Sequence, residues 1–403
     1  PPDPVRCSSS ERLHHPGSLQ WRHSWLDLMG DQPPQRVRRL RTFQVDQPGQ
    51  LRSSADQALL DLASNDTLGL LGHPDLNAAA QAAIASSGVG SGASRLISGS
   101  RPEHAELEHG LAQWLGRSRV LLFPSGFQAN IAALQLLADR HTVVLADRRI
   151  HHSLLVGVRA CGAKLERFAH NNLEDLERRL HQRQGSRCVV LSESLFSMEG
   201  SSPDVDALAA LCQRHGAPLL LDEAHARGVL GPGGRGLGHG LNGVSLLCGT
   251  FGKAFASGGA FLACGESLGE ELLQTSGAFR YTTALAPPLA AAAAAALQLI
   301  ASAEGDQRRK QLRRHAQLWR DSLSRAGWPR PAGVGPIVAL KLGDDGRALE
   351  AAAALEEQGL LVVAIRPPTV PEGEAMLRFS LRPQLPEDAL GRVLATLEPF
   401  KRP

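Results

Sequence analysis

Residues 219–225 are Leu-Leu-Leu-Asp-Glu-Ala-His, and residues 245–253 are Ser-Leu-Leu-Cys-Gly-Thr-Phe-Gly-Lys. Each segment begins with a short apolar run, which is typical of a buried strand in a parallel sheet. Each then continues into residues with reactive side chains. In open α/β sheets, ligands bind at the carboxyl ends of the strands. The two segments therefore predict a site that contains Asp222, His225 and Lys253.

Earlier segments show the same order, with an apolar run followed by polar or small residues. The runs cover residues 120–123, 142–146 and 188–191, and helical stretches such as 128–137 and 206–215 lie between strands. Strands that alternate with helices predict an α/β domain with a mainly parallel sheet. We expect this large cofactor-binding domain to span residues 57–290.

The segments on either side have different patterns. Residues 1–56 contain a polar, Pro-rich tail and an Arg-rich arm, which we interpret as an N-terminal extension. Residues 291–403 contain a long basic helical segment at about 305–326, followed by short apolar runs and two further helical segments. This pattern predicts a small α+β C-terminal domain.

The composition excludes several classes of protein. The 403 residues are 43% hydrophobic and 21% charged, with a net charge of +3. A disordered chain has less apolar content or more charge, and a collagen-like chain has a strict glycine period. A net charge this small gives no electrostatic footprint for binding a nucleic acid.

The cysteines and apolar runs indicate where the protein acts. The six cysteines form no C-x-x-C pair, and several lie in apolar runs, which favours reduced thiols in a cytoplasmic protein. No apolar run reaches the roughly 18 residues of a membrane-spanning helix, and residues 1–20 have no signal-peptide pattern. His14-His15 and His151-His152 lack further ligands at useful spacing. We therefore expect a soluble cytoplasmic protein with no membrane partner and no metal.

Lysine is scarce, so a reaction that needs a lysine has few candidates. The chain has five: Lys164, Lys253, Lys310, Lys341 and Lys401. Only Lys253 follows a predicted strand. Pyridoxal 5'-phosphate (PLP) needs a lysine for covalent attachment, a carboxylate beside its ring nitrogen and donors for its phosphate. Asp222 supplies the carboxylate, and the remaining contacts are available from Gly126, Phe127, Thr250, His225 and His151.

Six segments together resemble one family. They are Ser64–Gly69, Gly90–Gly99, Ser125–Phe127, Phe196–Gly200, Asp222–His225 and Thr250–Lys253. The chain resembles the α-oxoamine synthases, which are fold-type-I PLP-dependent transferases that join an amino acid to an acyl-CoA with decarboxylation. This resemblance implies a large domain with a mainly parallel sheet and a smaller α+β C-terminal domain.

The resemblance also implies catalytic and cofactor-binding roles. Lys253 would attach PLP, Asp222 would pair with its ring nitrogen, His225 would contact its O3′, and His151 would stack on its ring. The residues that would help to hold the cofactor and its phosphate are Gly126, Phe127, Ser197 and Thr250.

Further roles concern the substrates and the subunit interface. Asn65 and Arg378 resemble the groups that meet the substrate carboxylate, Thr369 would line the acyl path, and Arg38 matches a position near the acyl substrate. The family's site lies at the interface of a homodimer. Thr282 or Thr283 would therefore reach the phosphate bound by the neighbouring subunit.

Within the family, Ile365–Pro371 resembles the branch that condenses L-alanine with pimeloyl-CoA, or with a pimeloyl carrier-protein thioester, in biotin biosynthesis. Alternatives are a glycine C-acetyltransferase, a 5-aminolevulinate synthase type of enzyme and, further away, a PLP aminotransferase. A non-catalytic scaffold is disfavoured because Lys253, Asp222 and His225 are all present. The acyl chain length and the thioester carrier stay open.

Some residues depart from the family pattern or imitate another motif. Thr67 stands where the family usually has Tyr, and Arg227 stands where small residues are usual, so we expect Arg227 to affect the acyl entrance. Residues 231–236 match G-x-G-x-x-G. They contain Pro232 and lead to no predicted helix, so they lack the context of a dinucleotide site.

Overall fold

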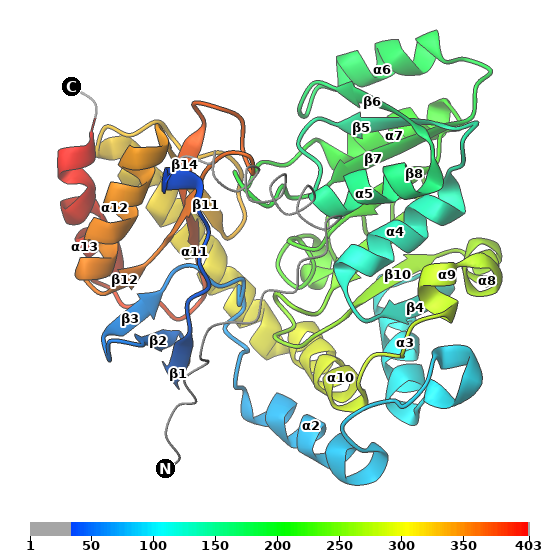
Figure 1. Ribbon diagram of the computed structural model, residues 1–403, viewed down its shortest axis with the longest axis horizontal. Helices are drawn as coiled ribbons and strands as arrows, with labels where there is room; N and C mark the ends of the chain where they lie inside the picture. Colours follow the sequence, from blue (N-terminus) through cyan, green and yellow to red (C-terminus); the bar gives the residue numbers. More distant parts are fainter. Residues whose placement is uncertain (1–33, 402–403) are drawn as a thin grey trace, which may run out of the picture. The chain divides into compact units, whose positions relative to one another are not determined.

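The computed structural model describes residues 34–401 (Figure 1). The chain divides into two compact units between Arg41 and Thr42. The described part of the first unit contains a short 3-10 helix, Pro34–Arg36. The predicted tail over residues 1–20, including His14 and His15, and much of the predicted arm lie outside the described residues.

The large sheet contains seven strands in the order β4-β10-β9-β8-β7-β5-β6. Neighbouring strands are parallel except at β10, which is antiparallel to both β4 and β9. The prediction of a mainly parallel sheet is therefore confirmed. The strand bounds are β4 Arg119–Phe123, β5 Val143–Asp147, β6 Lys164–Phe168, β7 Cys188–Glu193, β8 Leu219–Asp222, β9 Leu246–Thr250 and β10 Ala260–Cys264.

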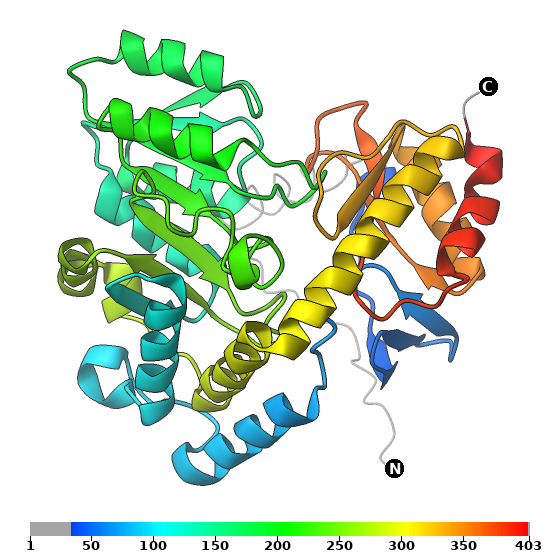
Figure 2. The same ribbon diagram turned by 180° about the vertical axis from the view of Figure 1, so that it is seen from behind.

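Helices lie on both faces of this sheet (Figures 1 and 2). Their bounds are α2 Pro74–Ser87, α3 Pro102–Leu115, α4 Gly126–Leu137, α5 His152–Cys161, α6 Leu173–Gln182, α7 Val205–Arg214, α8 Glu266–Thr275, α9 Gly277–Arg280 and α10 Pro287–Ala301. A π-helical turn, η2, spans Arg95–Gly99, and a 3-10 turn, η3, spans Pro232–Gly234.

Consecutive residues of a strand pack into different hydrophobic cores. Leu221 of β8 belongs to the core that includes Leu208 of α7, whereas its neighbour Leu220 belongs to the core that includes Leu134 of α4. Because both faces of the sheet are buried, the strands are continuously apolar, and ionisable groups occur where the strands end.

The C-terminal region forms a smaller antiparallel sheet, as predicted. Helix α11, Ala303–Arg325, leads to strands β11 Ile337–Gly343, β13 Val363–Ile365 and β14 Ala375–Ser380, arranged in the order β11-β14-β13. Helices α12, Asp345–Glu357, and α13, Ala389–Leu397, complete the region. Within residues 34–401, no single helix has the length and apolarity to cross a membrane, although α10 and α11, bent by 74°, meet those limits jointly.

A third sheet joins the N-terminal residues to the C-terminal region. Its order is β1-β2-β3-β12, with β1 Phe43–Gln47, β2 Gln50–Ser53, β3 Ala58–Asp61 and β12 Leu360–Leu361. Residues 43–53, which we assigned to an arm, therefore form two strands. β12 pairs with β3, and this pairing places Leu60 opposite Leu360, 300 positions later in the chain. The domain boundaries at residues 56 and 290 stay predictions.

Candidate active site

Three neighbouring strands of the large sheet end beside one another. Glu193 ends β7, Asp222 ends β8, and these two residues are register partners. Lys253 follows β9, which pairs with β8 on its other side. Glu193 and Asp222 are buried. The structure therefore brings Asp222 and Lys253 to one edge of the sheet, together with an acidic residue that the sequence analysis had not assigned.

The environment of Lys253 favours its neutral amine. Desolvation lowers the pKa of Lys253 to about 8, although the nearby carboxylates of Asp222 and Glu193 act in the opposite direction. The guanidinium of Arg378 adds to the lowering. A neutral amine can attack an aldehyde or accept a proton from a substrate, and an ammonium group can do neither.

Hydrogen bonds fix the orientation of the Asp222 carboxylate. Its Oδ1 accepts a bond of 2.9 Å from the backbone N–H of Ala224, and its Oδ2 accepts one of 2.8 Å from Nδ2 of Asn130. Burial, reinforced by the charge of Asp222, raises the pKa of the adjacent Glu193 well above its usual range. This shift favours the neutral carboxyl form of Glu193 beside Asp222.

His225 presents a neutral, buried imidazole. Burial lowers its pKa well below the usual value, and the positive charges of Lys253 and Arg378 lower it further. Among the described residues, Nδ1 of His225 is buried without a hydrogen-bond partner. A buried ring nitrogen without a partner costs stability unless a ligand satisfies it.

His151 stands at the N-terminus of α5, where its ring is exposed. Partial desolvation lowers the pKa of His151, and the charge of Lys253 acts in the same direction, whereas the Asp222 carboxylate opposes both. His151 and His225 are also close enough for charge on the first to lower the pKa of the second. The two histidines predicted to contact the cofactor therefore share one electrostatic environment with Lys253.

The N-terminus of α4 lies next to the turn after β9. Ser125 caps the helix by accepting a bond of 3.3 Å from the backbone N–H of Gln128. A Cβ added at Gly126 would lie 3.8 Å from Cβ of Thr250. The free N–H groups of a helix N-terminus attract phosphate. Gly126 and Thr250 are thus positioned together as predicted phosphate contacts, while the neighbouring Phe127 is 43% exposed.

Arg378 of β14 joins distant parts of the chain. Its Nε donates to the backbone oxygen of Ser197 at 2.6 Å, and one terminal nitrogen donates to Oδ1 of Asn65 at 2.9 Å. The other terminal nitrogen donates to Oγ of Ser380 at 2.8 Å. Burial lowers the pKa of Arg378 to about 10, and within residues 34–401 no carboxylate forms an ion pair with it. A buried guanidinium with only neutral partners is suited to a substrate carboxylate.

Within residues 34–401, no hydrogen bond joins Thr369, Thr282 or Thr283 to the residues of this group. Thr369 is exposed in the loop before β14. Thr282 and Thr283 line a cavity of about 380 Å³ with residues of η2. Arg38 belongs to the first compact unit, and its predicted place near the acyl substrate stays a prediction.

Three buried polar residues near the site were not assigned from the sequence. They are Asn130, Ser153 and Glu193, each at most 3% exposed. All three lie in the segments that follow predicted strands, so their position relative to the strand ends was an available signal. Their hydrogen bonds with Asp222 and His151 depend on how neighbouring strands align, which no single segment reveals.

Arg227 does not line an entrance, contrary to our expectation. Its side chain is buried and forms an ion pair with the equally buried Glu223. Glu223 also accepts a hydrogen bond of 2.8 Å from the backbone N–H of Gly238. The ion pair therefore holds the loop after η3 against the sheet. Arg227, which stands where the family usually has a small residue, thus contributes to the packing of the interior.

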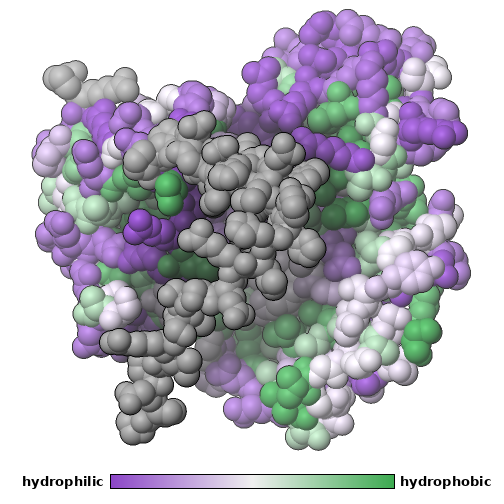
Figure 3. Space-filling model, in the orientation of Figure 1, coloured by the Kyte–Doolittle hydropathy of each residue, from purple (hydrophilic) through white to green (hydrophobic). Residues whose placement is uncertain are grey.

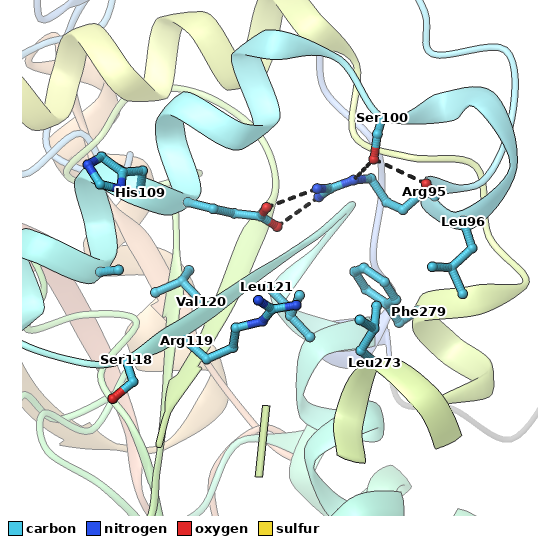
Figure 4. Close-up of a pocket in the computed structure, with 12 residues that line it drawn as sticks. Arg95, Leu96, Ser100, His109, Ser118, Arg119, Val120, Leu121, Leu273 and Phe279 are labelled. Atoms are coloured by element: carbon cyan, nitrogen blue, oxygen red, sulfur yellow. Dashed lines mark hydrogen bonds and ion pairs between the residues drawn. The ribbon is translucent and has the colours of Figure 1, made fainter. Parts of the chain in front are cut away.

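Two other features are separate from this site. A cavity of about 260 Å³ lies beside η2 and β4 (Figure 4). Its Arg95 is already bound to both carboxylate oxygens of Glu108, at 2.8 and 2.9 Å. Among the described residues, Glu177, His181 and His215 could together hold a metal ion, but Arg214 already pairs with Glu177 at 3.0 Å.

The residues at the strand ends fit PLP. A lysine with a lowered pKa, a fixed carboxylate and a buried imidazole with an unpartnered nitrogen match the aldehyde, ring nitrogen and O3′ of this cofactor. The N-terminus of α4 offers donors to its phosphate. This fit rests on the groups present in the chain and on their placement around Lys253.

The family model "Aminotransferase class I and II" matches residues 57–397. The chain belongs to this family and, within it, to the α-oxoamine synthases. An 8-amino-7-oxononanoate synthase from Stutzerimonas stutzeri (strain A1501) is 42% identical over 345 residues, which cover 85% of this chain and 87% of that protein. The protein of the same name from Gluconacetobacter diazotrophicus is 42% identical over 368 residues, covering 89% and 92%.

Solved structures share the fold over nearly the whole chain. Serine palmitoyltransferase from S. paucimobilis, with bound PLP and myriocin, has a TM-score of 0.84 at 27% identity and covers 96% of both chains. An 8-amino-7-oxononanoate synthase from Francisella tularensis has a TM-score of 0.74 at 28% identity, covering 85% of this chain and 97% of its own. The predicted fold class and the predicted family are therefore confirmed.

Proposed function

We propose that the chain condenses L-alanine with a pimeloyl thioester to form 8-amino-7-oxononanoate, with release of CO2 and the free thiol. The identity of 42% over 85% of the chain to a synthase of that name carries this conclusion. The chain is a PLP-dependent acyltransferase of this family. When bound, PLP supplies an electron sink for the negative charge that develops at the substrate Cα.

The chain's own residues bind and orient the amino acid. The Arg378 guanidinium, held by Asn65 and Ser380, donates to the alanine carboxylate. This contact fixes the orientation of the bonds at Cα relative to the cofactor ring. The Asp222 carboxylate, held by Ala224 and Asn130, keeps the ring nitrogen protonated.

Lys253 moves the proton. Its pKa of about 8 leaves roughly a tenth of the amine neutral at pH 7, far more than for an ordinary lysine, so the amine can take the Cα proton and return it after decarboxylation. His151 would help to hold the cofactor ring and would assist at the thioester carbonyl, the carbon at which the new C–C bond forms. The leaving thiol is either coenzyme A or a carrier-protein thiol, and kinetics with the two thioesters separate them.

We expect one combination to dominate when thiol release is measured across amino acids and acyl thioesters. L-Alanine with pimeloyl thioester should exceed glycine or serine with acetyl-, succinyl- or palmitoyl-CoA by about 100-fold or more in kcat/KM, because a pocket rejects misfitting groups in the transition state. Pimeloyl-CoA and pimeloyl carrier protein are assayed side by side.

Other outcomes of this assay identify the alternatives. Thiol release with glycine and a short acyl-CoA would identify another α-oxoamine synthase and overturn the proposal. Amino-group transfer without thiol release, leaving pyridoxamine phosphate, would identify an aminotransferase. Mass spectrometry of the product separates these results.

We also propose that the enzyme is a cytoplasmic homodimer. The five described cysteines are free thiols, as expected in a reducing compartment. Large apolar side chains are exposed around η2, including Ile97 at 80% and Tyr281 at 81%. Figure 3 shows apolar surface near the bottom of the view, in the region of α2. Val89, two residues after the end of α2, is 75% exposed. Exposed apolar surface of this kind marks an interface.

The patch around η2 supports a site shared between subunits. Leu96, Ile97 and Tyr281 line the same cavity as Thr282 and Thr283, the predicted contacts to the neighbouring phosphate. An interface that covers this cavity would bring both threonines against the second subunit. This placement of Thr282 and Thr283 is part of the proposal.

The variant Ile97→Asp should weaken the dimer by roughly 100-fold, because a buried unpaired charge costs several kcal/mol. Sedimentation equilibrium measures the association, and PLP affinity should fall with it. The matched control is Val45→Asp, at a residue that is 65% exposed and lies in β1 rather than near η2. An Ile97→Asp protein as dimeric as the control would contradict this assignment of the interface.

A further inference from the structure

Asn130 connects two residues of the site without being one of the groups that the proposed reaction uses. It lies on α4 with its side chain 2% exposed. Its Nδ2 donates to Oδ2 of Asp222 at 2.8 Å and to Oγ of Ser153 at 2.9 Å. An amide nitrogen has two hydrogens, so both are used.

The orientation of the Asn130 amide follows from its acceptors. A carboxylate oxygen accepts hydrogen bonds only, so the NH2 group must face Asp222. Oδ1 of Asn130 is buried and has no partner among residues 34–401. A buried unpartnered oxygen costs stability. Asn130 therefore contributes less to the stability of the fold than a fully bonded side chain would, which points to a role in the site.

The second branch determines which nitrogen of His151 carries its proton. The backbone N–H of Ser153 donates to Nδ1 of His151 at 3.3 Å, so Nδ1 accepts and carries no hydrogen. Oγ of Ser153 lies 2.7 Å from the same Nδ1. Since Oγ accepts from Asn130, its own hydrogen is free to point at Nδ1. The neutral imidazole therefore carries its proton on Nε2.

The charged form of His151 is disfavoured by the same contacts. A proton on Nδ1 would face the Ser153 N–H, and both groups would be donors. The lowered pKa of His151, due to desolvation and to Lys253 against the opposing charge of Asp222, agrees with this geometry.

We infer that Asn130 is a positioning residue that holds the Asp222 carboxylate toward the cofactor ring nitrogen and, through Ser153, holds His151 in its Nε2–H form. The inference rests on the proposed function only in taking PLP as the ligand beside Asp222. It assigns Asn130 no contact with substrate or cofactor. The Asn130 side chain on α4 thereby orients both Asp222, beside the ring nitrogen, and His151, at the face of the ring.

A double-mutant cycle on PLP affinity tests the Asp222 branch. Asn130→Ala should weaken binding of PLP to the apoenzyme by about tenfold, because a hydrogen bond to a charged group is lost. In an Asp222→Ala background the same change should have less than about a twofold effect, because Asn130 then has no carboxylate to orient. The dissociation constants are measured by fluorescence titration.

The outcomes of the cycle are distinct. A tenfold loss in both backgrounds would show that Asn130 acts directly or through the fold, and no loss in either would show that it has no role; both overturn the inference. Asn130→Asp keeps the volume and places a second carboxylate beside Asp222, so it should bind PLP more weakly than Asn130→Ala. Far-UV circular dichroism of each apoenzyme checks that it is folded.

Ser153→Ala tests the His151 branch alone. PLP affinity should stay within about twofold of wild type while kcat falls about fivefold, the effect of one neutral hydrogen bond. A Ser153→Ala protein that loses as much PLP affinity as Asn130→Ala would contradict the inference that Asn130 acts on Asp222 and on His151 through separate hydrogen bonds. Wild-type protein that binds no PLP would instead contradict the proposed function, so the two failures are distinguishable.

Discussion

Replacing Lys253 by alanine is expected to remove the visible absorption of the lysine-bound cofactor and to lower turnover by more than about 1,000-fold. None of the other four lysines follows the carboxyl end of a strand in the large sheet, so none can replace its amine. The pKa of about 8 makes Lys253 a nucleophile near neutral pH. Absorbance spectra and thiol release from pimeloyl thioester with L-alanine measure the two effects.

The pH dependence of cofactor capture gives a second measurement on the same lysine. The neutral amine is the reactive form, so the rate at which wild-type apoenzyme captures PLP should rise with pH through about 8 and level off above it. The matched control is Lys310→Ala, at an exposed position on α11. Lys253→Ala protein that keeps both the visible absorption and turnover would exclude Lys253 as the attachment site.

Asp222→Asn is expected to lower kcat by roughly 100- to 1,000-fold while the protein stays folded. The amide is nearly isosteric and its oxygen can still accept from Ala224, so the volume at the end of β8 is kept, although its NH2 group cannot accept the bond from Asn130. It removes the charge that pairs with the protonated ring nitrogen, and the loss of a buried charge partner is worth several kcal/mol. Steady-state kinetics with saturating PLP measure the effect.

The neighbouring Glu193 should not compensate for this substitution. Burial is the larger cause of the raised pKa of Glu193 and persists after the charge of Asp222 is removed, and Glu193 accepts a hydrogen bond from the backbone N–H of His151. The matched control is Asp206→Ala, at an exposed position in the first turn of α7, which should retain wild-type kcat. An Asp222→Asn enzyme with kcat within a few-fold of this control would contradict the assigned role of Asp222.

The large sheet was predictable because its strands are buried on both faces. Runs such as 188–191 and 219–221 are apolar at every position and end at polar residues, and the structure places β7 and β8 there. β1 and β2 were not predicted, since their residues are exposed or half-buried and carry no apolar run. Their sheet also depends on β12, whose partner β3 is distant in the chain, so no local pattern reports it.

The active site also combines residues that local sequence patterns reveal with contacts that they do not reveal. Asp222, His225 and Lys253 could be found because each follows an apolar run within five residues. The roles of Arg378, Asn65 and Ser197 were implied only by family resemblance, and the contacts of Arg378 with the other two were not predicted, since they join segments more than 180 residues apart. The expectation for Arg227 was wrong because exposure cannot be inferred from charge when a buried carboxylate, Glu223, stands four residues before it.

The sequence by itself determined the alternation of buried strands and helices, the reactive residue types at the strand ends, and the single lysine suited to PLP. These follow from local apolar runs and their ends. Only the tertiary structure decided that Asn130 bonds to Asp222 and Ser153, that burial beside Asp222 raises the pKa of Glu193, and that Arg378 lacks an acidic partner among the described residues. Hydrogen bonding and desolvation depend on which distant groups meet, and only the packing of strand against strand brings them within reach.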